Sequence, residues 1–461
     1  MRVPRRVDRA LDAGLERIRG QFGVPAGFPP AVALAAVEAA HRAPGPDHVD
    51  RTGRSFVTLD PASSTDLDQA FALERAGDDI VLHYAIADVG FFVRPGDALD
   101  EEAWRRGVTV YMPDERARLY PAALSEGAAS LLPSGPRPAV VFTVRVDPEG
   151  EVHLHGAERA LVHSRAKFAY ATVRDDDLPA ELAELARRVE LAEDRRGAPR
   201  VEFPEQELER VDGHWELRFA PRLASEARNA SMSLATNLAV AEALHAAGTG
   251  LFRVMDEPDE GAVGRLRHSA RAFGLDWPAG QSLADFQRSL AANDPRAAAF
   301  LVAVRRAGGG ASYEPYAPGV RPWHSAMAAT YAHATAPLRR LADRYVVEAA
   351  LAVANGHPVP DDVQAAFGAL PEAMAKGESL ANRVESAVMD LGEAVLLADS
   401  VGEVFDAVVV DEDHRGTVIQ LVDPAVLVRV VAHRVDPGDD VRVRLTGVDV
   451  AARAVHVERV G

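Results

Sequence analysis

The sequence has no cysteine, no long apolar run and no excess of positive charge. The absence of cysteine among its 461 residues excludes disulfides and thiolate metal sites, so a metal would need carboxylate, imidazole or amide ligands. No apolar segment reaches the roughly 18 residues that a membrane-spanning helix needs. The amphipathic first twenty residues also lack the apolar core of a secretory signal. These absences predict a cytoplasmic protein with no membrane partner.

Acidic residues outnumber basic ones. The sequence contains 51 Lys and Arg residues and 69 Asp and Glu residues, which gives a formal net charge of −18. This balance argues against broad, sequence-independent binding of nucleic acid, which normally requires a basic face. Net charge describes solubility and non-specific contacts, however, and leaves a recessed basic groove possible. Only specific motifs can therefore indicate a nucleic-acid function.

The pattern of apolar residues predicts an α+β multidomain protein. Residues 1–50 read as two short helices in a basic segment, which predicts a helix-turn-helix-like accessory domain or, equally, a structural cap. Strand patterns followed by helical patterns predict a mixed α/β domain over 51–400. Five short strands in 401–461 predict a small all-β barrel of OB type. The later helices are expected at about 178–195, 223–247, 259–273, 281–306, 336–354 and 361–400.

A dense group of acids follows the strand "SFVTLD". Asp60 ends this strand, and Asp66 and Asp68 lie beyond the short loop "PASST", so a loop that folds back would bring three carboxylates together. Without a cation their repulsion would raise their pKa values and destabilise the fold. Hard oxygen ligands favour Mg²⁺ or Mn²⁺. A hydrated acidic turn is the alternative, and this stretch alone leaves both interpretations open.

An arginine pair occurs in "YAHATAPLRRLADRY". Thr335 and Pro337 predict a helix start, which places Arg339 and Arg340 in a first turn where the helix dipole disfavours cations. An anion shared with the free N–H groups would explain this placement, and phosphate fits guanidinium geometry. Asp343 lies within one turn of both, so we expect one arginine to pair with it and the other to bind phosphate. Acids for a metal and an arginine for phosphate indicate metal-assisted phosphodiester chemistry.

These motifs resemble those of the ribonuclease II (RNB) family of exoribonucleases. "FVTLDPASSTDLDQAFAL" is similar to the family signature, and further similar blocks follow in the family's order over roughly residues 50–400. The blocks are "HYAIADVGFFV", "RGVTVYMPD", "SLLPSGPRPAVVFTV", "SRAKFAYATV" and "YAHATAPLRRLADRYV". The C-terminal strands resemble the family's OB-fold RNA-binding domain. The two cold-shock domains of well-known members are absent, and the basic helical segment stands in their place.

The resemblance implies processive hydrolysis of single-stranded RNA from a free 3′ end, with release of 5′-nucleoside monophosphates. By resemblance, Asp60, Asp66 and Asp68 would organise Mg²⁺, or Mn²⁺ as a substitute, together with the attacking water. Arg339 matches the arginine that steadies the scissile phosphate. A monomer is expected.

The resemblance also implies a set of RNA-binding residues. Tyr111 matches the tyrosine that holds the 3′-terminal nucleotide, and Tyr170 matches one that contributes to the choice of RNA over DNA. Phe203 would stack on a base at the channel entrance, and Glu385 would lie near the terminal nucleotide. Arg340 would join Arg339 in reading phosphates unless it pairs with its neighbouring acid. Tyr170 and Phe203 could instead be core residues.

Two departures from the family pattern qualify these expectations. Gln69 stands where the family has a fourth Asp, and its carbonyl could remain a metal ligand but carries no charge and cannot act as a base. The lower site charge would weaken metal affinity or require another acid such as Asp88 to move in, and the alternative function is a catalytically inactive RNA-binding protein. Ala230 and Ser231 stand in the segment where a glutamate is usual, so discrimination between ribose and deoxyribose is expected to be looser. The possible substitutes are Glu226 and Asn229.

Overall fold

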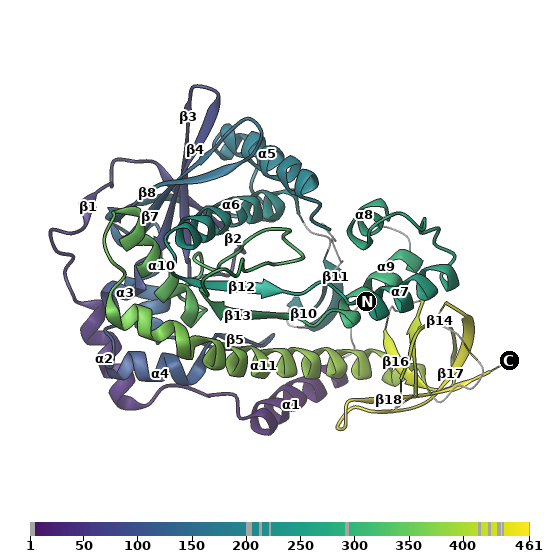
Figure 1. Ribbon diagram of the computed structural model, residues 1–461. Coiled ribbons are helices and arrows are strands. Elements are labelled where there is room, and N and C mark those ends of the chain that lie inside the picture. Colours follow the sequence, from purple (N-terminus) through teal and green to yellow (C-terminus); the bar gives the residue numbers. More distant parts are fainter. Residues whose placement is uncertain are drawn as a thin grey trace.

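The computed structural model describes residues 5–199, 205–211, 214–220, 223–290, 295–413, 416–422, 426–430, 435 and 438–460. A seven-stranded sheet with the strand order β1-β8-β7-β4-β3-β2-β9 forms its centre (Figure 1). Its strands are β1 (Val49–Asp50), β2 (Phe56–Asp60), β3 (Gln69–Ala76), β4 (Asp79–Ala87), β7 (Arg137–Val146), β8 (Val152–Val162) and β9 (Ser164–Ala169). The central strands β3, β4, β7 and β8 are antiparallel, whereas the outer pairs β1–β8 and β2–β9 are parallel.

The sequence of β4 explains its central place. Its run of Ile, Val, Leu and Ala is buried along nearly the whole strand, as expected for a short continuous apolar segment. Residues 148–150 form the turn that joins β7 and β8 into a hairpin. Gly150 is required in this turn, since its φ is +81° and a Cβ atom would lie 2.1 Å from the carbonyl oxygen of Arg188.

Helices pack around this sheet and share its core (Figure 1). They are α2 (Pro30–Ala40), α3 (Val89–Phe92), α4 (Ala98–Arg106), α5 (Glu181–Arg196), α6 (Ala224–Ala246) and α10 (Leu341–Ala354). Phe56, Phe71 and Phe142 of the sheet are buried together with Leu244 of α6 and Val346 of α10. None of the helices in the described part of the chain is both long and apolar enough to cross a membrane.

The long helix α11 (Asp361–Leu397) carries the N-terminal helix α1 (Arg5–Phe22) along its side (Figure 1). Leu11, Leu15 and Ile18 of α1 are buried against Val384 and Leu391 of α11. The second N-terminal helix, α2, instead buries its apolar face in the core of the central sheet. The helical content expected for residues 1–50 is therefore present, and its likeness to a helix-turn-helix domain stays a prediction.

A two-stranded ribbon, β12 (Leu251–Met255) with β13 (Ala311–Pro315), crosses the molecule between α6 and α11 (Figure 1). Between its strands the chain forms α7 (Glu260–Ala272), α8 (Leu283–Ser289) and α9 (Pro295–Ala307), which we call the inserted helices. The single helix expected over 281–306 is wrong, since α8 and α9 are separate and α9 begins at a proline, a residue favoured at a helix start. Two short ribbons complete this region, β5 (Val110–Tyr111) with β6 (Arg116–Ala117) and β10 (Glu205–Val211) with β11 (His214–Ala220).

The five strands expected after residue 400 are confirmed. They form an antiparallel sheet in the order β16-β15-β14-β17-β18, with Val409, Ile419 and Leu445 in its core. The strands are β14 (Val404–Asp413), β15 (Gly416–Leu421), β16 (Leu427–Val430), β17 (Asp440–Asp449) and β18 (Ala454–Arg459). The α+β class, with a mixed catalytic-type module and an OB-like C-terminal unit, is therefore confirmed.

Candidate active site

The acids of the "PASST" loop line one cavity of about 1290 Å³. Asp60 is the last residue of β2, and Asp68 directly precedes β3, so the loop between these neighbouring strands opens toward the cavity. Most of the predicted site residues meet there: Asp60, Asp66, Asp68, Gln69, Tyr111, Tyr170 and Arg339 all belong to its lining.

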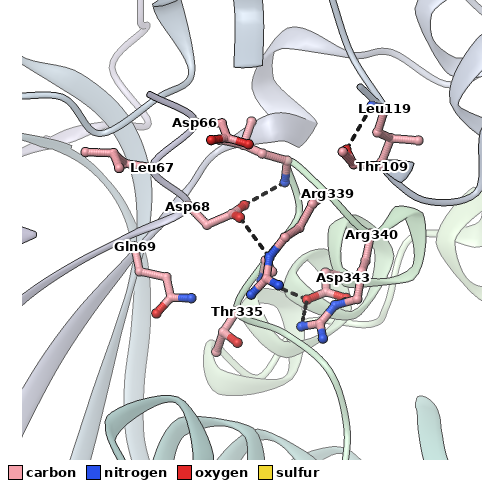
Figure 2. A network of polar contacts seen from close by, with 12 residues as sticks. Asp66, Leu67, Asp68, Gln69, Thr109, Leu119, Thr335, Arg339, Arg340 and Asp343 are labelled. Atoms are coloured by element: carbon pink, nitrogen blue, oxygen red, sulfur yellow. Dashed lines mark hydrogen bonds and ion pairs between the residues drawn. The ribbon is translucent and has the colours of Figure 1, made fainter. Parts of the chain in front are cut away.

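Each acid has partners within the protein. Asp68 is buried, and its Oδ1 accepts a hydrogen bond of 2.7 Å from the backbone N–H of Leu338 while its Oδ2 lies 3.4 Å from Nε of Arg339 (Figure 2). Asp66 accepts a hydrogen bond of 2.5 Å from Arg116. Within the described residues, no three acidic or histidine side chains lie close enough to form a ready-made metal centre. All three carboxylates border the same cavity, and their expected convergence on a metal stays a prediction.

Burial controls the charge of two of these acids. It raises the pKa of Asp60 to about 6, against the opposing effect of the Arg339 and Lys167 cations. Burial likewise raises the pKa of Asp68 to about 7, although Arg339 and the Leu338 N–H oppose this rise. A cation in the cavity would favour the ionised form of both carboxyls. The oxygen donors present therefore fit a hard divalent ion such as Mg²⁺.

The side-chain oxygen of Gln69 is hydrogen-bonded within the protein instead of being free to bind a divalent ion. Its Oε1 accepts hydrogen bonds from the hydroxyl of the buried Tyr84 and, at 3.1 Å, from Ser233 Oγ. Because an amide oxygen has two lone pairs, these two donors occupy it, and the expected ligation of a metal by Gln69 would require breaking them. Asp88 does not replace it, because that residue caps α3 and pairs with His48 at 3.1 Å, outside the cavity lining.

Arg340 pairs with Asp343 as expected, the phosphate contact of Arg339 stays a prediction, and the expected helix start near residue 336 is wrong. α10 begins at Leu341, and the turn before it is held by a 2.8 Å hydrogen bond from the Ala336 N–H to Asp343. Arg340 donates to both carboxylate oxygens of Asp343, at 2.9 and 2.8 Å, and does not line the cavity (Figure 2). This pairing is the structural role that the sequence left open for Arg340, and its contact with RNA stays a prediction. The Arg339 side chain is 44% exposed and reaches the cavity.

The two tyrosines face the cavity and do not belong to the core. Tyr111 is 48% exposed, although it stands between the buried Val110 and Met112 in sequence. Tyr170 accepts a hydrogen bond of 2.7 Å from Asn229 Nδ2, and both side chains line the cavity. Burial raises the pKa of both phenols, that of Tyr111 to about 12, so both stay neutral at ordinary pH.

Other predicted residues lie elsewhere. Glu385 is exposed on α11 and lies outside the cavity lining, and its expected place near a terminal nucleotide stays a prediction. Phe203 lies outside the described residues. Glu226 does line the cavity, but it also accepts a 2.7 Å hydrogen bond from the N–H of Leu223 at the start of α6.

The cavity also contains residues that sequence reasoning missed. Arg116, which holds Asp66, is one of them, and Arg196 and Trp323 are two more. Acids predominate among the described residues of the lining, which differs from a basic groove. The acids are Asp60, Asp66, Asp68, Glu190, Glu193, Glu226 and Glu257, and the arginines are Arg116, Arg196 and Arg339.

Comparison with known families covers most of the chain. Residues 49–354 match the RNB domain, and residues 403–460 match the RNase II-type exonuclease C-terminal S1 domain. Ribonuclease R of Escherichia coli is 28% identical over 415 residues, which cover 81% of this chain and 50% of that relative. Ribonuclease R of Thermotoga maritima is 25% identical over 407 residues, covering 82% and 57%. The chain thus spans about half the length of the curated relatives it matches.

Solved structures share the fold. The apo form of Mycoplasma genitalium RNase R superposes with a TM-score of 0.85 at 18% identity, covering 98% of this chain and 78% of that one. Yeast Ssd1, described as a pseudonuclease, superposes with a TM-score of 0.69 at 17% identity, covering 94% and 55%. At these identities the likeness concerns the fold, which proteins described as nucleases and as a pseudonuclease share.

Proposed function

Because this chain belongs to the RNB-domain family, we propose that it hydrolyses single-stranded RNA from a free 3′ end and releases 5′-nucleoside monophosphates. The observation that carries the proposal is the single cavity lined by Asp60, Asp66, Asp68, Arg339 and Tyr111. Carboxylates for a metal, a half-exposed guanidinium for phosphate and an exposed phenol ring for a base are the groups that such a reaction needs.

The roles follow from the contacts of each side chain. Asp60 and Asp66 would hold the divalent ion, Mg²⁺ or in its place Mn²⁺, which would activate water and stabilise charge on the phosphate oxygens. Asp68, bonded to the Leu338 N–H, orients Arg339 at 3.4 Å. The guanidinium then binds the scissile phosphate, for which its planar donors are suited.

Two further contacts position the substrate. Tyr111 offers an exposed ring on which the terminal base stacks. The Tyr170 hydroxyl and the Asn229 amide, 2.7 Å apart, offer hydrogen bonds to the ribose. Since the 2′-hydroxyl distinguishes RNA from DNA, this pair supplies the sugar discrimination for which the family's usual glutamate is absent here.

The test uses a 5′-labelled single-stranded RNA, the protein, Mg²⁺ or EDTA, and the variant Asp68→Asn. We expect 3′ shortening and mononucleotide product only with the unmodified protein in Mg²⁺. The variant keeps an oxygen that can accept from the Leu338 N–H, so its folding should be preserved and its melting temperature is the control. A DNA oligomer of the same sequence measures the sugar discrimination.

A second candidate is an RNA-binding protein without hydrolytic activity. The observation that favours it is Gln69, whose amide oxygen is bonded to Tyr84 and Ser233 instead of facing a metal. The same experiment separates the two functions. Tight binding of the labelled RNA with no shortening, even with Mn²⁺ added, would support binding alone.

A further inference from the structure

An arginine lies directly against one of the acids that border the cavity. Nη1 of Arg116 donates a hydrogen bond of 2.5 Å to Oδ1 of Asp66, and both side chains line the cavity. The Arg116 side chain is 23% exposed and that of Asp66 is 13% exposed, so salt screens this ion pair less than a pair on the open surface. The carboxylate that the proposed function assigns to a divalent ion therefore has a protein cation as its partner.

The backbone holds Arg116 in this position. Arg116 pairs with Tyr111 across the β5–β6 ribbon, and the Met112 N–H donates to the Glu115 carbonyl at 2.9 Å to close the turn between them. The guanidinium carbon of Arg116 lies 5.8 Å from the centre of the Tyr111 ring. The positive charge is thus fixed between an acid and an aromatic ring of the same cavity.

The acids next to Arg116 in sequence bind other arginines. Asp114 pairs with Arg19 of α1, and Nε of Arg19 also lies 3.8 Å from Glu115. In the part of the chain that the structure describes, Asp66 is the acid paired with Arg116. Arg116 therefore cannot leave Asp66 without losing its ion-pair partner.

The other acids of the cavity also face cations, but in a different way. Oδ2 of Asp68 lies 3.4 Å from Nε of Arg339, and the positive charges of Arg339 and Lys167 both favour the ionised form of Asp60. Lys167 itself donates to backbone carbonyl oxygens of the "PASST" loop. Arg116 differs from both cations because it hydrogen-bonds directly to a carboxylate assigned to the ion.

We propose that Arg116 competes with the divalent ion for Asp66 and thereby raises the metal concentration that the site requires. The assignment of Asp66 to the ion rests on the proposed function. A carboxylate oxygen bonded to a guanidinium is not free to bind a metal, and a fixed positive charge a few ångströms away repels a divalent cation. Gln69 acts in the same direction, because it supplies no negative charge.

A supporting role for Arg116 would have the opposite effect. If Arg116 oriented Asp66 toward the ion, its removal would weaken metal binding, commonly by about 10- to 100-fold for groups that hold metal ligands. If Arg116 competes with the ion, its removal strengthens metal binding. The sign of the change therefore separates the two roles.

The test measures binding of Mn²⁺ by electron paramagnetic resonance without RNA, so it does not depend on hydrolysis. Asp66→Asn should weaken binding and so identifies the ion bound at this site. We expect Arg116→Met to bind Mn²⁺ roughly tenfold more tightly, the effect of removing one unit charge a few ångströms from a divalent ion in water. Methionine offers no hard oxygen to the ion. Arg116→Lys keeps the charge and should stay close to the unmodified protein.

Arg118→Met is the matched control. Arg118 follows the same ribbon and pairs with Glu126 at 2.8 Å, outside the described lining of the cavity. Its loss changes the net charge equally and should leave Mn²⁺ affinity nearly unchanged. Melting temperatures show whether each variant is folded, and Arg116→Gln is a second variant for which tighter binding is expected.

Equal or weaker Mn²⁺ binding by Arg116→Met and Arg116→Gln would overturn the competition, as would a gain of the same size in Arg118→Met. A parallel assay of RNA hydrolysis in Mg²⁺ keeps the two proposals apart. Tighter Mn²⁺ binding by Arg116→Met without any shortening of RNA supports the competition and contradicts hydrolysis. Shortening of RNA with no gain in Mn²⁺ affinity supports hydrolysis and contradicts the competition.

Discussion

The amide of Gln69 lies between two hydroxyl groups, where the family has an acid. Tyr84 is buried, and burial strongly raises the pKa of its hydroxyl, so this group remains a donor at all ordinary pH values. The Tyr84 and Ser233 hydroxyls also lie 2.8 Å apart, so the three side chains form a closed polar triangle. This triangle holds the amide in place but supplies no negative charge, so under the proposed function metal binding would fall to Asp60 and Asp66.

Restoring an acid at this position should strengthen metal binding. We expect Gln69→Asp to lower the Mg²⁺ concentration needed for half-maximal hydrolysis, because an added negative charge attracts a divalent cation. The same substitution should lower the melting temperature without metal, since it buries a charge beside Tyr84. Gln69→Asn has the same length as Asp without the charge and is the control. An equal Mg²⁺ requirement in both variants would contradict a charge effect.

A buried acid outside the cavity predicts a dependence of stability on pH. Burial, with a smaller effect from Asp390, raises the pKa of Glu393 from 4.5 to about 8. The unfolded chain then releases this proton at lower pH than the folded protein, so the free energy of unfolding falls as the pH rises from about 4.5 to 8.

Glu393→Gln should remove this loss. Its melting temperature relative to the unmodified protein should therefore increase between about pH 5 and pH 9. Glu385→Gln, which removes an exposed carboxylate from the same helix, controls for the loss of one negative charge. A melting-temperature difference that is equal at both pH values would argue against the raised pKa.

At the scale of elements, close backbone contacts position the walls of the cavity. The Thr109 N–H donates to the Arg339 carbonyl at 3.0 Å, and the Leu341 N–H donates to the Gly107 carbonyl at 2.9 Å. α11 packs directly behind this segment, because a Cβ atom on Gly377 would lie 2.8 Å from the Arg106 carbonyl oxygen. The helix therefore sets the position of the strand that leads to Tyr111.

Two glycines of α11 give a matched test of this contact. Gly377→Ala should lower the free energy of unfolding by about 1–3 kcal/mol, the usual effect of overpacking, even though alanine favours helices. Gly368→Ala, whose added Cβ would meet nothing within 4 Å, should instead raise it by roughly 0.5–1 kcal/mol. Chemical denaturation measures both, and changes of the same sign would contradict the close contact.

Local patterns predicted much of this architecture, and tertiary contacts account for the errors. The helices α5, α6 and α11 follow the expected ranges closely, because an apolar period of 3.6 residues is a local signal. α10 begins later than expected because Asp343 reaches back to bond the Ala336 N–H and Arg340. The acid motif predicted a shared cavity for Asp60 and Asp68. The place of Trp323 in the cavity could not be predicted, since it depends on the long-range backbone bond between its segment and Met255 of β12.

For the whole molecule, the acidic lining has a consequence for how RNA would bind. The chain has a net charge of −18, and acids also predominate in the described lining of the cavity. Arg116 and Arg339 of this lining are already paired with acids. Few cations are therefore available to replace the counterions of a polyanion. Under the proposed function, binding should depend mainly on stacking, on Arg339 and on divalent ions.

This predicts a weak dependence of RNA affinity on salt. With about one phosphate contact, that of Arg339, the slope of log affinity against log monovalent salt should be near −0.7 for a single strand. Fluorescence anisotropy with a labelled RNA in EDTA measures it, and Arg339→Gln should make the slope shallower. A slope several times steeper would mean that a basic surface outside the cavity dominates binding.

The packing of α1 on α11 also sets an order of events during synthesis. Leu11 leaves the ribosome roughly 380 positions before its partner Leu391. At a synthesis rate of about 5–20 residues per second, the apolar face of α1 stays uncovered for roughly 20–80 seconds, until α11 has been synthesised. During translation this face is exposed to chaperones and to other nascent chains. Because α11 contacts β5, whose Val110 lies beside Tyr111, one wall of the cavity is completed only after α11 has been made.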